Sequence, residues 1–140
     1  MRLFLDANIL VSVLNKEYPL FSYSARILSL GNNKRFKIYT SPVCLAIAFY
    51  FAEKKHGTQS AKQKISLLAG NIMITDVGKE TVLSSLANKK VNDFEDGIEY
   101  YSAQKSKCEV IITEDVADFY FSEIEVLNTK NFIEKYMCSN

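Results

Sequence analysis

The segment RLFLDANILVSVLN, residues 2–15, sets a short apolar strand directly before an amphipathic helix. The run RLFL and Asp6 have the length and composition of a buried strand, and Ile9, Val13 and Leu14 fall on one face of the following helix. Asp6 ends the apolar run, where a buried and unpaired carboxylate would cost several kcal/mol. This position therefore requires a hydrogen-bonding partner or a metal ion.

Strands and helices alternate along the rest of the chain. After the first strand at 2–6, the pattern predicts strands at 36–40, 71–75, 110–113 and 124–127. It predicts further helices at 20–31, 43–55, 58–69, 79–87, 94–105 and 131–137, with a short helical turn at 116–121. This order favours right-handed crossovers and an α/β fold with a mainly parallel five-stranded sheet covered by helices on both faces.

Length and composition indicate one domain spanning residues 1–140. The chain has 48% apolar and 24% charged residues, which excludes global disorder. No stretch approaches the roughly 18 consecutive apolar residues of a membrane span, so we expect a cytoplasmic protein. The three cysteines, Cys44, Cys108 and Cys138, are widely spaced and far from the single His56, which favours small core residues over disulfides or a zinc site.

The charges are segregated along the chain. Residues 1–90 carry a net charge of +8 and residues 91–140 carry −7. A basic part suits a polyanion such as a nucleic acid, while an acidic cluster repels one unless metal ions intervene. The alternative interpretation is that solvated helix faces happen to divide the charges in this way.

Acidic side chains follow several of the predicted strands, where ligands bind in open parallel sheets. The positions concerned are Asp6, Asp76 and 113–115, and Asp93 and Asp96 open the helix before the fourth strand. Carboxylates gathered at one edge would have raised pKa values unless a cation lies among them, and oxygen ligands suit Mg²⁺ or Mn²⁺. The simpler interpretation of Asp93 is a helix cap, and Asp76 is more simply the cap of a helix beginning near Gly78.

Four segments resemble the motifs of PIN domains, the metal-dependent ribonuclease fold of VapC-type toxins. They are LFLDANILVSVL at 3–14, SPVCLA at 41–46, DFEDGIEYYSAQKSKCEVIIT at 93–113 and DVADF at 115–119. The resemblance spans nearly the whole chain in the same order. It implies a three-layer α/β/α sandwich with acids at one edge of a central parallel sheet. These acids would bind Mg²⁺ or Mn²⁺ for the cleavage of RNA.

The resemblance also assigns roles to individual residues. The family's first, third and fourth acids, which are catalytic and bind the metal, match Asp6, Asp96 and Asp115, with Asp118 as an alternative for the last. Small polar residues that orient ligands match Asn8, Ser41 and Thr113, and Asp93 matches an accessory acid. The second acid, usually a glutamate, is Ile47 here. We therefore expect weakened metal binding and low nuclease activity, both raised by the substitution Ile47→Glu.

Three functions fit these observations. The leading hypothesis is an endoribonuclease toxin with an antitoxin partner and possible homodimerisation, whose RNA substrate approaches over Lys34, Arg35, Lys37, Lys54 and Lys55. Ordinary solubility explains these basic residues equally well. The second hypothesis is a catalytically degenerate PIN module that binds RNA or a protein, which Ile47 favours. A receiver-type phosphoryl-transfer domain fits the sheet, but the sequence lacks both a paired acid beside Asp6 and a lysine after the last strand.

Overall fold

The computed structural model describes residues 1–138, and its centre is a sheet of five parallel strands in the order β3-β2-β1-β4-β5. The strands are β1 (Arg2–Leu5), β2 (Lys37–Thr40), β3 (Met73–Ile74), β4 (Val110–Ile112) and β5 (Glu125–Leu127). Each lies where the apolar pattern predicts a strand. The parallel α/β sandwich expected from the sequence is therefore confirmed.

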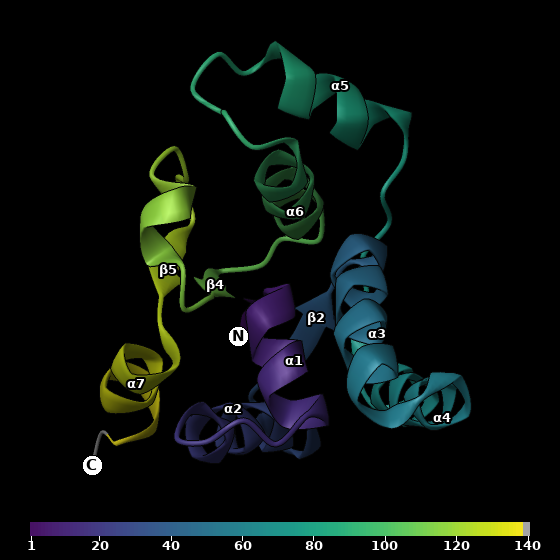
Figure 1. The fold of residues 1–140 in the computed structure, drawn as a ribbon. Coiled ribbons are helices and arrows are strands. Elements are labelled where there is room, and N and C mark those ends of the chain that lie inside the picture. Colours follow the sequence, from purple (N-terminus) through teal and green to yellow (C-terminus); the bar gives the residue numbers. More distant parts are fainter. Residues whose placement is uncertain (139–140) are drawn as a thin grey trace.

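Helices cover both faces of this sheet. Figure 1 shows α5 and α6 on one side of the strands and α1, α2 and α4 on the other. The helices are α1 (Ala7–Leu14), α2 (Leu20–Ser29), α3 (Pro42–His56), α4 (Thr58–Ala69), α5 (Lys79–Ala87), α6 (Phe94–Lys105) and α7 (Thr129–Phe132), with short turns η1 (Leu30–Asn32), η2 (Val116–Phe119) and η3 (Ile133–Met137). Within residues 1–138, no helix is both long and apolar enough to cross a membrane.

The central strand β1 determines where the sheet ends. Its apolar residues Leu3, Phe4 and Leu5 are fully buried, because helices cover both faces of a parallel strand. The amide of Asp6 donates to the carbonyl of Ile112 at 3.0 Å and so continues the β1–β4 pairing beyond the strand. Asp6 and the residue after Ile112 consequently lie side by side at the carboxyl edge of the sheet.

Polar caps start two of the helices near that edge. The hydroxyl of Ser41 accepts from the amide of Cys44 at 3.1 Å, at the start of α3. Asp93 caps α6 by accepting from the amides of Glu95 and Asp96, at 2.9 and 3.3 Å. These side chains fix the first turns of both helices, which carry residues of the candidate site.

Two smaller expectations are wrong. Asp76 does not cap α5, because it stands two residues before Gly78, which is the N-cap and makes no side-chain hydrogen bond. Cys138 is exposed near the C-terminal end, whereas Cys44 and Cys108 are buried as predicted.

The contact between α5 and α6 generates a first prediction. A Cβ atom added at Gly97 would lie 2.8 Å from Cγ1 of Val91 and 3.0 Å from Cβ of Ser85. Gly97→Ala should therefore lower the free energy of unfolding by about 1–3 kcal/mol, measured by urea denaturation. Gly31→Ala is the control, because its nearest atoms lie at 3.6 Å and its stability should be unchanged. Equal stability of both variants would contradict this packing.

Candidate functional site

The carboxylate of Asp6 is buried at the junction of β1 and α1, with 7% of its surface exposed. Its Oδ1 accepts from the amide of Ala7 at 2.6 Å, as the N-cap of α1, and its Oδ2 accepts from the hydroxyl of Thr113 at 2.7 Å. The hydrogen-bonding partners that the sequence requires for this acid are therefore a helix amide and the threonine that ends the neighbouring strand.

Asn8 and Thr113 connect Asp6 to Asp115. The side-chain amide of Asn8 donates to Oγ1 of Thr113 and to Oδ2 of Asp115, both at 3.1 Å. The same Thr113 oxygen accepts from the amide of Asp115 at 3.0 Å. Four of the residues singled out in the sequence thus form one continuous hydrogen-bonded group at the edge of the sheet.

Asp96 lies half-buried on the first turn of α6, beside the same group. Burial raises its pKa to about 7, and the negative charges of Asp93, Asp6 and Asp118 add to the shift. An ordinary aspartate is fully ionised at neutral pH, whereas this one is only partly ionised. A cation close to Asp96 would favour the ionised form.

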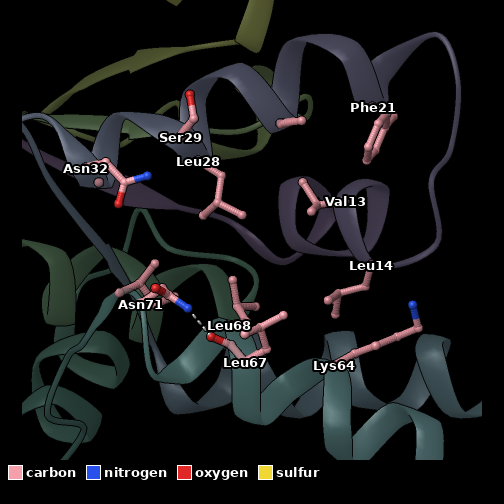
Figure 2. Close-up of a pocket in the computed structure, with 13 residues that line it drawn as sticks. Val13, Leu14, Phe21, Leu28, Ser29, Asn32, Lys64, Leu67, Leu68 and Asn71 are labelled. Carbon is pink, nitrogen blue, oxygen red and sulfur yellow. Dashed lines mark hydrogen bonds between the residues drawn. The ribbon is translucent and has the colours of Figure 1, made fainter.

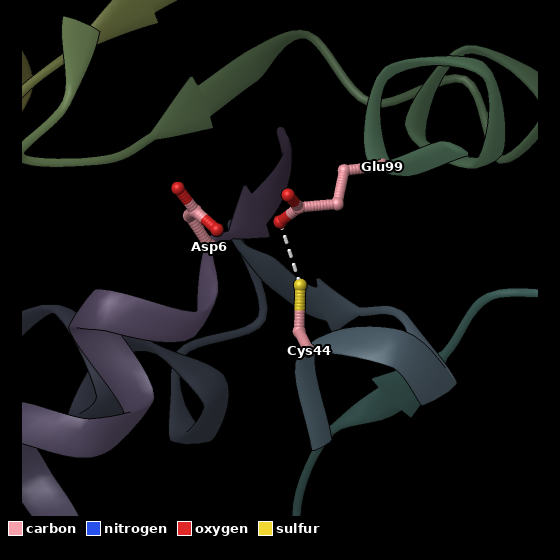
Figure 3. Close-up of side chains that lie close together, drawn as sticks. All are labelled: Asp6, Cys44 and Glu99. Carbon is pink, nitrogen blue, oxygen red and sulfur yellow. Dashed lines mark hydrogen bonds between the residues drawn. The ribbon is translucent and has the colours of Figure 1, made fainter. Parts of the chain in front are cut away.

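Glu99, one turn further along α6, is a site residue that the sequence reasoning missed. It is only 2% exposed, and the thiol of Cys44 donates to its Oε1 at 2.7 Å. Burial, followed by a hydrogen bond with Asp6 and the charge of Asp6, raises the pKa of Glu99 to about 11. Figure 3 shows the carboxyl groups of Asp6 and Glu99 facing each other beside the Cys44 sulfur.

The tightest group of potential metal ligands comprises Asp6, Cys44 and Glu99. One ligand atom from each of these side chains lies within 4.8 Å of the other two, and no other such group of three occurs among residues 1–138. A sequence signal for Glu99 was present, because it stands three residues after Asp96 and therefore on the same face of the helix. The contact with Cys44 joins α3 to α6, and the sequence around either residue does not predict it.

A cavity of about 420 Å³ opens over these acids. Its acidic lining residues are Asp6, Glu17, Glu95, Asp96, Glu99 and Asp115, and none of its lining residues is a lysine, arginine or histidine. Asn8 adds a further polar side chain, and the apolar part of the lining includes the half-buried Ile47 and the exposed Phe51. A concentration of oxygen donors without basic partners fits a hard divalent cation such as Mg²⁺ or Mn²⁺.

Four of the predicted supporting residues do not line this cavity. One is Thr113, which instead donates its hydroxyl to Asp6. Ser41 and Asp93 use their side chains to cap α3 and α6. Asp118 is exposed on η2, and its charge acts on Asp96 without joining the hydrogen-bonded group. Of the two candidates for the last acid, the structure therefore brings Asp115 rather than Asp118 to the cavity.

The basic residues considered for RNA binding come from two parts of the chain. Lys34 and Arg35 precede β2 and Lys37 begins it, at the amino edge of the sheet. Lys54 and Lys55 stand at the end of α3, where the ammonium group of Lys55 donates to the carbonyl of Asn15 at 2.6 Å, beyond the C-terminal end of α1. None of the five is among the residues that line the acidic cavity.

A second cavity, of about 400 Å³, lies between α1, α2 and α4. Figure 2 shows the side chains of Val13, Leu28 and Leu68 directed into it, with Lys64 at one side. Its lining is mainly apolar and contains no acidic residue, so it offers no catalytic group. Such a cavity suits an apolar side chain of a partner rather than a reaction.

A parallel α/β sheet with an acidic cavity at its carboxyl edge is the arrangement to compare with known protein families. A PIN-domain family model matches residues 2–117, and the chain belongs to the PIN-domain family.

Particular relatives cover almost the whole chain. Ribonuclease VapC1 of Aquifex aeolicus (strain VF5) is 26% identical over 142 residues, which cover 96% of this chain and 95% of that protein. VapBC2 from Rickettsia felis, solved with a promoter DNA fragment, matches with a TM-score of 0.70 and 18% identity, covering 91% of this chain and 98% of that chain. A toxin–antitoxin complex from Klebsiella pneumoniae matches with a TM-score of 0.67 and 20% identity, covering 90% and 96% of the two chains. The two structural likenesses show the fold.

The hydroxyl of Thr113 generates a second prediction. Thr113→Val keeps the shape of the side chain but removes a donor to Asp6 and an acceptor for Asn8 and Asp115, so the free energy of unfolding should fall by about 1–3 kcal/mol. Thr75→Val is a matched control, because Thr75 is also buried and its hydroxyl has no hydrogen-bond partner among the described residues. That control should be as stable as the natural protein or more stable. Chemical denaturation of both variants measures the difference, and equal losses would contradict the assigned hydrogen bonds.

A third prediction concerns the pH dependence of the metal-free protein. Three titratable groups act on Glu99: Asp6 at the β1–α1 junction, Cys44 on α3, and Asp96 on the same helix as Glu99. Its pKa of about 11 exceeds the ordinary 4.5, so the folded protein keeps a proton that the unfolded chain releases as the pH rises above 4.5. The contribution of Glu99 to stability is therefore complete below pH 4.5 and is lost as the pH rises toward 11.

Glu99→Gln replaces the carboxyl group with a neutral group of the same shape. Relative to the natural protein, this variant should gain stability with rising pH, by up to about 1.4 kcal/mol per pH unit. Urea denaturation in a chelator at about pH 5 and about pH 8 measures the gain. Glu53→Gln should show no such trend, because Glu53 lies outside the cavity. A constant difference at the two pH values would show that Glu99 is ionised in the folded protein.

Proposed function

We propose that this protein is a divalent-metal-dependent endoribonuclease of the PIN type and the toxin of a toxin–antitoxin pair. The observation that carries the proposal is the cavity lined by six carboxyl groups and no basic side chain, at the carboxyl edge of a PIN-domain sheet. The relative from Aquifex aeolicus, a ribonuclease by name, supports RNA as the substrate class.

Asp6, Asp96 and Asp115 are the residues that would hold Mg²⁺ or Mn²⁺. When bound, such an ion lowers the pKa of a coordinated water and stabilises the charge that develops on the phosphate during phosphodiester hydrolysis. The protein's own contribution is orientation. Thr113 fixes one oxygen of Asp6, and Asn8 fixes Asp115 in turn, so the carboxylates are already arranged before a substrate arrives.

The apolar part of the cavity is a candidate surface for a base of the RNA. Phe51 is 45% exposed and lines the same cavity as the acids, and its ring lies 5.3 Å from that of Tyr50. An exposed aromatic ring beside a reactive site suits stacking of an unpaired base, which requires no particular sequence. In this proposal the metal rather than the five basic residues named above neutralises the phosphate at the reacting centre.

An antitoxin is the proposed protein partner. Solved structures similar to this chain include toxin–antitoxin complexes from Klebsiella pneumoniae and nontypeable Haemophilus influenzae. The apolar cavity beside α4, where Leu67 is 72% exposed, has the chemistry to accept apolar side chains of such a protein. Homodimerisation and a cytoplasmic location remain predictions.

A second candidate function is an RNA-binding or protein-binding module with little catalysis. The observation that favours it is Ile47, an aliphatic side chain on the wall of an otherwise acidic cavity. The two functions differ in whether bound RNA is cleaved.

A cleavage assay with purified protein separates these functions and is the fourth prediction. The natural protein should cleave RNA in Mn²⁺ or Mg²⁺ and lose this activity in chelator, and Asp6→Asn should reduce the rate by about 100-fold or more. Asp76→Asn is the control, because Asp76 is exposed and lies outside the cavity. If the natural protein binds RNA but does not cleave it in either metal, the binding module is favoured instead.

A further inference from the structure

Ile47 and Glu99 line the same acidic cavity from different helices. Ile47 stands on α3, where the resemblance to PIN domains implies a glutamate, and Glu99 stands on α6, where the resemblance implies none. We propose that Glu99 supplies from α6 the metal-binding carboxylate that Ile47 does not supply from α3. This inference rests on the proposed function, because it concerns the same metal site.

The position of Glu99 relative to Asp6 is the first argument. The ligand atoms of Asp6, Cys44 and Glu99 lie within 4.8 Å of one another. Oxygens that share one Mg²⁺ or Mn²⁺ are at most about 4 Å apart, so a small side-chain adjustment brings Asp6 and Glu99 onto one ion. Glu99 also lies one turn after Asp96, on the face of α6 that lines the cavity. A carboxylate at this position is therefore close enough to share an ion with Asp6, in the cavity that Asp96 also lines.

The lack of a basic partner is the second argument. Glu99 is 98% buried, yet among residues 1–138 it forms no ion pair and receives no hydrogen bond from an N–H group. Cys44 fixes one of its oxygens, and its carboxyl group lies beside that of Asp6 (Figure 3). A glutamine or an apolar side chain would fill this space without the cost of a buried acid. A divalent cation offsets that cost, which gives the carboxyl group a role that packing does not.

Cys44 acts in this arrangement as a positioning residue. Its amide is held by Ser41 in the first turn of α3, and its thiol donates to Oε1 of Glu99. Mg²⁺ and Mn²⁺ prefer oxygen to sulfur ligands, so the thiol orients the glutamate rather than binding the ion. Cys44→Ser keeps a donor at this place and should bind metal more tightly than Cys44→Ala.

Isothermal titration with Mn²⁺ tests the inference without depending on catalysis. Glu99→Gln should weaken Mn²⁺ binding by about tenfold or more, while Glu53→Gln, the same change on α3 outside the cavity, should leave it unchanged. Adding Ile47→Glu to Glu99→Gln should restore the affinity to within about threefold of the natural value. Ile47→Glu should tighten binding by a larger factor in that background than in the natural protein. Circular dichroism and thermal melting without metal verify that each variant is folded.

Three results of the titration would overturn the inference. Unchanged affinity in Glu99→Gln, together with loss of binding in Asp6→Asn, would overturn the inference and leave the proposed function standing. A loss in Glu99→Gln that Ile47→Glu fails to restore would also overturn it, because the two carboxyl groups would then not be interchangeable. Absence of Mn²⁺ binding by the natural protein would overturn both the inference and the metal-dependent function.

Discussion

The hydrogen bond from the Thr113 hydroxyl to the carboxylate of Asp6, 2.7 Å long, joins two strand ends that are 107 residues apart in the sequence. Both groups are buried, and the same hydroxyl oxygen accepts from Asn8 and from the amide of Asp115. The sheet places β1 and β4 side by side, but this hydroxyl orients the acids that follow them. A buried, fully used hydroxyl permits one arrangement only, and the geometry of the cavity depends on it.

The second constraint is electrostatic. The carboxyl edge of the sheet receives acids from β1, from α6 and from the loop after β4, and burial raises the pKa values of Asp96 and Glu99. The N-terminal ends of α1 and α6 point their free amides toward this edge, and Asp6 and Asp93 accept some of them. The remaining repulsion is uncompensated by any basic residue lining the cavity. The gathering of acids without a basic partner therefore has two effects: it gives the cavity affinity for a cation, and it lowers the stability of the metal-free protein.

Local pattern was sufficient to predict the fold, because each strand is a short apolar run and polar turns separate the runs from the helices. It also led to Asp6, Thr113 and Asp115, since residues that follow parallel strands must share an edge. Asn8 was indicated only by the resemblance to PIN domains. Glu99 was missed because its partner Cys44 lies 55 residues away on another helix, and periodicity does not show which helices touch. The basic residues before β2 were associated with the substrate on charge alone, although their place at the beginning of a strand already put them at the other edge.

The strand order has a consequence for the newly made chain. The central strand β1 is synthesised before its neighbour β4, which can pair with it only after Val110–Ile112 has left the ribosome. Until then Asp6 has neither Thr113 nor Asp115 beside it, and α6 cannot seat Glu99 against Cys44. Any chemistry that requires these acids together is therefore absent from chains in which β4 has not yet paired with β1.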